Sequence, residues 1–120
     1  MKHLLWITAV IEAGAGAALI GFPSRVMDLL LGPSPDAQPS ATVVRVIGGA
    51  LLALGLLCWL ASRDTQRPCA GRMVAVMTAY NPCAAIALGA IGMRAPSVGI
   101  VLWPAVVLHT AMAGWCIMRV

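Results

Sequence analysis

Four polar residues stand in long apolar stretches of the sequence: Glu12, Arg45, Asn81 and His109. Glu12, for example, interrupts the apolar segment VIEAGAGAALIGFP. A carboxylate and an imidazole can exchange protons, an amide can hydrogen-bond to either of them, and a guanidinium can pair with the carboxylate. Because an isolated polar or charged group is costly to remove from water, each of these side chains needs a partner. We therefore treat the four residues as one candidate polar site.

The composition indicates the medium around these residues. Of the 120 residues, 61% are hydrophobic and 10% are charged, which excludes an ordinary soluble domain. About 20 helical residues cross a hydrocarbon core roughly 30 Å thick, and the chain has four apolar segments of that length. They cover residues 4–22, 42–61, 73–93 and 97–118. The sequence predicts an all-α, antiparallel bundle of four transmembrane helices, up-down-up-down, in a single membrane domain over residues 1–120.

Basic residues at the ends of these segments indicate the orientation. One side holds Lys2, Arg63, Arg67, Arg72 and Arg119, and the other side holds Arg25 and Arg94. Because cytoplasmic loops carry the excess of Lys and Arg, both termini are expected in the cytoplasm. We expect a multi-pass protein of the bacterial cytoplasmic (inner) membrane, surrounded by lipid and without a nucleic-acid partner. Glu12 favours a retained first helix over a cleaved signal peptide.

Proline, glycine and serine mark the loops. In the first loop, Ser24 as N-cap and Gly32 as C-cap predict a short helix on the outer membrane surface. The third loop, RAPS, is so short that the last two segments must be antiparallel neighbours, with Pro96 at the start of the fourth helix. Pro82 and Pro104 fall inside segments, where the missing N–H predicts a kink.

Small residues predict the helix contacts, because close backbone approach drives helix association in lipid. The predicted contact lines are Ala13, Ala17 and Gly21; Gly49 and Ala53; and Ala75, Ala79, Cys83 and Ala87. Each line is expected to pack against a neighbouring helix of the bundle.

The depths of the polar residues can be compared at 1.5 Å per helical residue. Counted from the cytoplasmic ends, Glu12 and Asn81 lie about 12 Å deep and His109 lies about 13–14 Å deep. Arg45 lies roughly 12 Å further along the membrane normal. We expect the first three residues to meet inside the bundle. Arg45 either reaches towards Glu12 or extends to the outer headgroups.

The charge state of Glu12 has two alternatives. Burial opposes ionisation of a carboxyl group, whereas an adjacent imidazolium or guanidinium favours it. Two cations in so small a bundle predict an ionised Glu12 paired with Arg45 or His109, so that Glu12→Gln costs about 3–5 kcal/mol by leaving a cation unpaired. A protonated Glu12 bonded to Asn81 would instead tolerate glutamine. A polar cluster that only sets the helix register is a further possibility.

Two resemblances follow from these residues. The four spans with one glutamate in the first, Glu12, look like the small multidrug resistance transporters, which implies a dimer that exchanges protons for cationic drugs. The chain more closely resembles a group of uncharacterised small four-helix bacterial integral membrane proteins, which implies the fold without an activity. The residues that carry this second resemblance are Glu12, Phe22, Pro23, Leu31, Gly32, Arg45, Tyr80, Asn81 and His109.

The sequence contains the polar site but no catalytic domain, nucleotide motif or sizeable soluble segment. We therefore expect a non-enzymatic accessory or binding subunit that acts as a homo-oligomer or with another membrane protein. We expect no cofactor and no metal, since a bis-histidine haem site needs a second histidine within the spans besides His109. The alternative is a proton-coupled small-molecule transporter that uses Glu12. A membrane enzyme with Glu12 and His109 as base and acid is a third hypothesis, for which the sequence offers no nucleophile.

Overall fold

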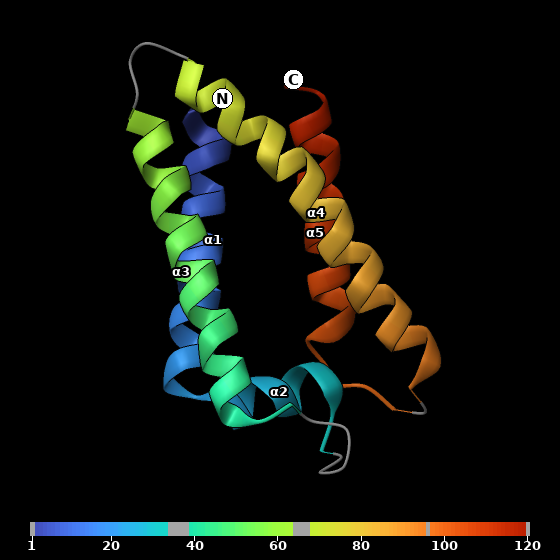
Figure 1. Cartoon of the computed structure of the whole chain (residues 1–120). Coiled ribbons are helices and arrows are strands. Elements are labelled where there is room, and N and C mark those ends of the chain that lie inside the picture. The colour runs from blue at the N-terminus through green and yellow to red at the C-terminus, as the bar shows by residue number, and fades with distance from the viewer. Residues whose placement is uncertain (1, 34–38, 64–67, 96, 120) are drawn as a thin grey trace.

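The computed structural model describes residues 2–33, 39–63, 68–95 and 97–119, which contain five helices and no strand. In chain order the helices are α1 (Lys2–Gly21), α2 (Pro23–Leu31), α3 (Ala41–Arg63), α4 (Pro68–Arg94) and α5 (Leu102–Ile117) (Figure 1). The predicted all-α fold is confirmed. Helices α1, α3 and α4 are long and apolar enough to cross a membrane, and they match the first three predicted segments. Such segments fold as helices because a helix satisfies its own backbone hydrogen bonds in lipid.

The fourth segment differs from its prediction. Helix α5 has 16 residues, which is shorter than a full span of about 20. Residues 97–101 leave the helical path because the N–H groups of Gly99 and Val101 donate to the carbonyls of Leu30 and Leu29, at 3.1 and 2.9 Å. A side chain on Gly99 would overlap the Leu29 carbonyl. The predicted start of the fourth span is therefore wrong, and three helices of the described chain have full span length. Pro96 lies outside the described residues.

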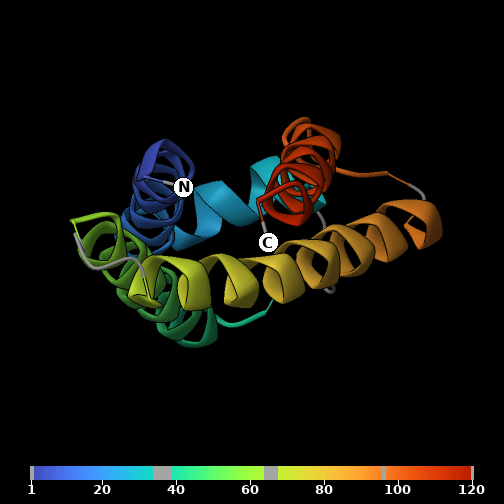
Figure 2. The same ribbon diagram turned by 90° about the horizontal axis from the view of Figure 1, so that it is seen from above.

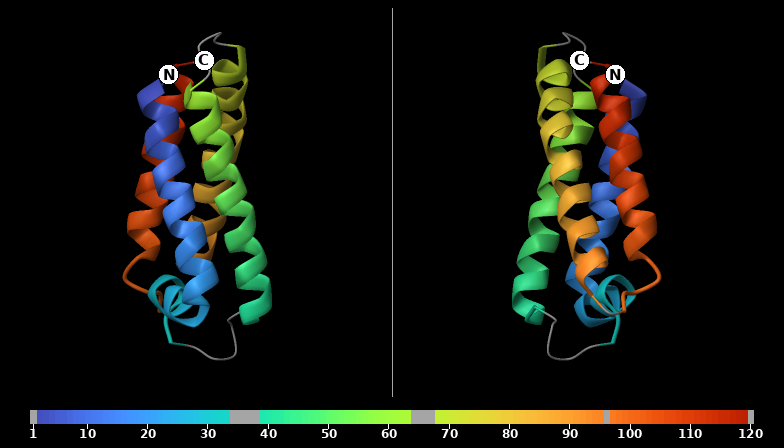
Figure 3. Two further views of the ribbon diagram at one scale, coloured as in Figure 1. Left: turned by 90° about the vertical axis from the view of Figure 1, so that its left-hand side faces the viewer. Right: turned by 90° about the vertical axis from the view of Figure 1, so that its right-hand side faces the viewer.

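The four larger helices form two antiparallel pairs. Helix α1 packs along α3 and α4 packs along α5, and the two pairs diverge away from the chain termini (Figure 1). Seen from above, α1 and α5 lie on one side of the molecule, with α3 and α4 on the other (Figure 2). Helix α2 lies across the far end, where it contacts α1, α3 and α5. The N- and C-terminal ends lie together at the opposite end (Figure 3).

Glycine brings the backbones of α1 and α3 into contact. A Cβ atom on Gly16 would lie 2.6 Å from the carbonyl oxygen of Gly48, and a Cβ on Gly48 would lie 2.8 Å from that of Gly16. About two turns further along α3, a Cβ on Gly55 would lie 2.8 Å from the amide nitrogen of Ala13. The two helices can approach this closely only because no side chain separates them at these points.

Most of the predicted contact lines are wrong. Gly21 and Gly49 face open space. On α4, the line Ala75, Ala79, Cys83 and Ala87 is exposed, and the buried residues are instead Ala70, Val74, Met77 and Asn81. Small residues four apart occur on more than one face of these helices, so their spacing does not identify the face that turns inward.

Prolines and one glycine explain the helix ends. Helix α2 begins at Pro23 with Phe22 as its N-cap, so the predicted Ser24 N-cap is wrong. Gly32 is the C-cap as predicted, with φ 83° and its N–H donating to the Asp28 carbonyl at 2.9 Å. Pro104 lies in the first turn of α5, where an N–H needs no partner within the helix, so the reason for a kink there disappears.

The apolar core lies at the end of the molecule that holds the termini. All four larger helices contribute to it, through Leu4, Leu5, Ala9, Cys58, Ala61, Ala70, Val74, Met77, Met112 and Cys116. Tyr80 and Trp115 pack against this cluster. The core therefore joins the two helix pairs at one end, and Tyr80 marks its boundary towards the end where the pairs diverge.

Candidate functional site

The candidate site forms the layer next to the core. Glu12, Asn81 and His109 each lie about one helical turn beyond the nearest core residue of their own helix, and each is close to the middle of that helix. Glu12 is 3% exposed and Asn81 is 1% exposed, while His109 is half-buried. The structure brings these three predicted residues to one level, which agrees with the depths counted along the sequence.

Tyr80 connects this layer to α1. Its hydroxyl donates to Oε2 of Glu12 at 3.2 Å, and this hydrogen bond joins the two helix pairs. The Tyr80 ring also meets the His109 ring edge-on, with centroids 5.8 Å apart and planes at 81°. This edge-to-face arrangement is a favourable one for aromatic rings. Tyr80 thus contacts both α1 and α5 from its position on α4.

Asn81 connects α4 to α5. Its Nδ2 donates to the carbonyl oxygen of Met77 at 3.0 Å, which sets the orientation of the amide. Oδ1 of Asn81 then faces Nδ1 of His109 at 3.0 Å. Because an amide oxygen only accepts hydrogen bonds, Nδ1 of His109 carries the hydrogen and donates it. Glu12, Tyr80, Asn81 and His109 therefore form a polar layer across three helices, which we call the polar cluster.

Tyr80 was not among the predicted site residues, although it belonged to the pattern behind one resemblance. It is the single tyrosine of the chain and precedes Asn81 directly, so its depth was available from the sequence. Successive residues of a helix point about 100° apart, which lets Tyr80 face α1 while Asn81 faces α5. That division between two neighbours depends on where α1 and α5 lie, and the sequence does not contain it.

Arg45 lies away from the polar cluster. Its side chain is exposed, and its Nε donates to the carbonyl oxygen of Ile20 at 3.3 Å. Ile20 is in the last turn of α1, where carbonyl groups lack partners within the helix and a basic side chain interacts favourably with them. Eight residues, or about 12 Å, separate Ile20 from Glu12 along α1. Of the two alternatives for Arg45, contact with Glu12 is therefore wrong, and extension to the outer headgroups stays a prediction.

No ion pair joins Glu12 to Arg45 or to His109 in the described part of the chain; its partner is the Tyr80 hydroxyl. The predicted pairing with a cation is therefore wrong, because Arg45 lies near the far end of α1 and His109 is turned towards Asn81. The expected loss of 3–5 kcal/mol on Glu12→Gln depended on that pairing. A glutamine at this position can still accept the hydrogen bond from Tyr80.

The chemistry of the polar cluster is that of a hydrogen-bonded contact between helices. In the described residues, every fully buried side-chain nitrogen or oxygen has a hydrogen-bond partner. The same residues contain no group of three or more His, Cys, Asp and Glu that could hold a metal ion. Two grooves on the molecule lie elsewhere, one between α3 and α4 and one between α1 and α3. The cluster can therefore hold three helices in register, and Glu12 is its one acidic group.

Comparison with known proteins gives no match, since no protein-family model, curated protein or solved structure is significantly similar to this chain. The two resemblances drawn from the sequence stay predictions.

Proposed function

We propose that the chain is a four-pass protein of the bacterial cytoplasmic membrane that acts as a non-enzymatic accessory or binding subunit. Helix α5 would make the fourth pass, since a short apolar helix is accommodated by local thinning of the bilayer. The common end of the two termini agrees with an even number of passes (Figure 3). The basic residues near this end, Lys2, Arg63, Arg72 and Arg119, favour a cytoplasmic location for it.

The outer face of α4 is the observation that carries this proposal. Ala75, Ala79, Cys83 and Ala87 are all exposed and lie four residues apart. Small side chains at this spacing let a second transmembrane helix approach closely, and close approach is a main source of attraction between helices in lipid. A helix of a second copy or of another membrane protein would cover this line, as a subunit role requires.

The polar cluster supports the proposal by holding α4 in one rotation. Ala79 and Asn81 lie about 200° apart around the helix axis, so one points outward when the other points inward. Hydrogen bonds between membrane helices contribute about 0.6–2 kcal/mol each. Tyr80 and Asn81 each bond to a different neighbouring helix. Together they favour the rotation that presents Ala79 and Cys83 on the outside.

Photo-crosslinking from Cys83 tests this proposal. Cys69→Ala leaves Cys83 as the exposed thiol among the described residues, because Cys58 and Cys116 are buried. The thiol is labelled with a benzophenone maleimide in native membranes and irradiated, and the product is identified by mass spectrometry. We expect one dominant adduct, either to a second copy or to one other membrane protein.

The matched control places the same label on α5, in a variant with Cys69→Ala, Cys83→Ala and Val107→Cys. Val107 is exposed but lies outside the α4 line. This variant should give lipid adducts and no dominant protein adduct. The same pattern of products from both positions would contradict a subunit role for the α4 face.

A proton-coupled small-molecule transporter is the second candidate. The position of Glu12 favours it, since a buried carboxyl group lies at the junction of the two helix pairs. Helix pairs that rock about this junction would expose Glu12 to each side of the membrane in turn. Cells that overproduce the wild-type protein should then outgrow cells with Glu12→Gln on cationic toxic compounds. Equal growth across a panel of such compounds would count against transport.

A further inference from the structure

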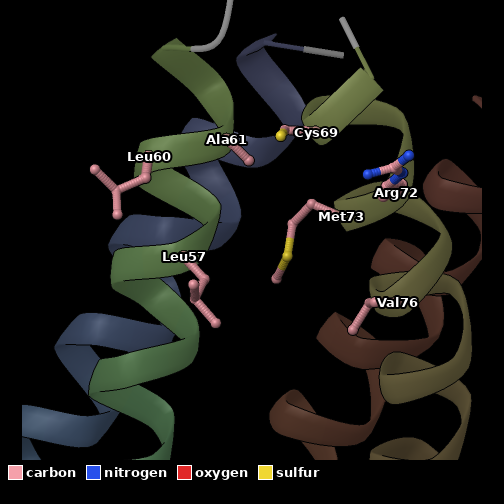
Figure 4. Close-up of a pocket in the computed structure, with 7 residues that line it drawn as sticks. All are labelled: Leu57, Leu60, Ala61, Cys69, Arg72, Met73 and Val76. Carbon is pink, nitrogen blue, oxygen red and sulfur yellow. The ribbon is translucent and has the colours of Figure 1, made fainter.

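A groove opens between α3 and α4 at the end of the molecule that holds the termini. It has a cavity volume of about 350 Å³. Its apolar walls come from Leu57, Leu60 and Ala61 on α3 and from Met73 and Val76 on α4, and Arg72 lies at its edge (Figure 4). The side chains of Leu57 and Met73 point into the space between the two helices (Figure 4). The groove is therefore lined mainly by apolar side chains and has one cationic residue at its edge.

The positive charge of Arg72 lies at the end of this groove that is nearer the chain termini. Arg72 is exposed and has no carboxylate partner among the described residues. It is in the second turn of α4, whose N-terminal end begins at Pro68 and carries the positive end of the helix dipole. Arg63, which lies over the Trp59 ring at 4.2 Å, ends α3 on the same side of the molecule. Val76 lies one turn, about 6 Å, deeper along α4 than Arg72.

We propose that this groove binds one anionic phospholipid, with an acyl chain between α3 and α4 and the phosphate on Arg72. The inference uses the membrane topology proposed above but is independent of the accessory role. A phospholipid has the same order of groups as the groove, with charge at the membrane surface and hydrocarbon towards the middle. The planar guanidinium binds a phosphate through two parallel hydrogen bonds. Basic sites between transmembrane helices on the cytoplasmic side are suited to anionic headgroups.

Charge also argues for a lipid over a second copy of the chain. A parallel copy seated on this groove would bring its own Arg63 and Arg72 to the same membrane level. Such a dimer interface is disfavoured because it brings like charges into contact. An anionic headgroup would instead neutralise Arg72, and its acyl chain would cover Leu57 and Val76, which are about half exposed.

Native mass spectrometry of the purified full-length protein tests the lipid site. The protein is titrated in detergent with phosphatidylglycerol or with phosphatidylcholine of identical acyl chains. We expect one phosphatidylglycerol to stay bound, and Arg72→Gln to weaken this binding about fivefold, the change expected for one basic residue near the membrane surface. Phosphatidylcholine has the same phosphate, but its choline group cancels the net negative charge, so it should bind more weakly and should lose less affinity on Arg72→Gln.

Arg94→Gln is the matched charge control, since Arg94 is an exposed arginine at the other end of the same helix. Equal weakening by Arg72→Gln and Arg94→Gln, or equal binding of the two lipids, would overturn the proposal. Val76→Trp fills the groove from an exposed wall and should also release the lipid, whereas Val107→Trp on α5 should not. If Val76→Trp instead converts a dimer into a monomer and leaves lipid binding unchanged, the groove is a protein interface and the proposal is wrong. Circular dichroism of each variant shows whether the helices are intact.

Discussion

The two helices of each pair are joined by a different kind of contact. In the α1 and α3 pair, Gly16 and Gly48 bring backbone against backbone. In the α4 and α5 pair, the hydrogen bond between Asn81 and His109 joins side chains across the interface. The first contact depends on the absence of side chains, so any added atom must displace a helix. The second depends on particular polar atoms, so replacing either Asn81 or His109 removes that hydrogen bond without displacing a helix.

The largest effect is expected where the backbones touch. Gly16→Ile places a branched side chain where even a Cβ atom would lie 2.6 Å from the Gly48 carbonyl oxygen. We expect this change to lower the free energy of unfolding by about 3 kcal/mol, at the upper end for overpacking. Unfolding in mixed micelles, followed by circular dichroism, measures the change.

Gly14→Ile is the control for this prediction, because a Cβ on Gly14 meets nothing within 4 Å. It introduces the same residue on the same helix and should leave stability near that of the wild type. Equal losses for Gly14→Ile and Gly16→Ile would show that α1 and α3 do not meet through Gly16.

A smaller effect is expected where the two pairs are joined by a polar contact. Tyr80→Phe removes the hydroxyl that donates to Glu12 and should cost about 1 kcal/mol. Glu12→Gln keeps an acceptor for that hydroxyl and should cost less than about 1 kcal/mol. In a double-mutant cycle, the two changes should be non-additive because they alter one hydrogen bond.

Thr110→Val is the control for Tyr80→Phe, since the Thr110 hydroxyl bonds only within its own helix, to the Val106 carbonyl. Its effect on the free energy of unfolding should be smaller than that of Tyr80→Phe. A loss of about 3–5 kcal/mol on Glu12→Gln would instead support the ion pair between Glu12 and a cation that the sequence predicted.

The smallest effect is expected at Arg45. Its side chain is exposed and bonds to one carbonyl at the end of α1, so Arg45→Gln should change the free energy of unfolding by less than about 0.5 kcal/mol. Adding Arg45→Gln to Glu12→Gln should give the sum of the single effects, because the two residues share no partner. A double mutant more stable than Glu12→Gln alone would show that the two charges interact.

Depth along a helix was predictable, and rotation about its axis was not. Counting residues placed Glu12, Asn81 and His109 at one level, and the structure brings them together there. The same counting placed Arg45 well away from them. It did not show that Asn81 turns to His109 and Glu12 to Tyr80, because a rotation of α4 changes these partners without changing any depth. The exposed line through Ala79 was misassigned to the bundle interior for the same reason.

The sequence by itself determined the helical class and the approximate extents of three membrane-length helices, since long apolar segments must satisfy their backbone hydrogen bonds internally. It also determined the end of α2 at Gly32, because glycine alone adopts positive φ without strain. Only the tertiary structure decided the start of α5, where Gly99 and Val101 bond to α2 in place of a helical turn. It also decided the pairing of Glu12 with Tyr80. Both depend on which surfaces of two distant segments meet, and that is set by the packing of the whole chain and not by local pattern.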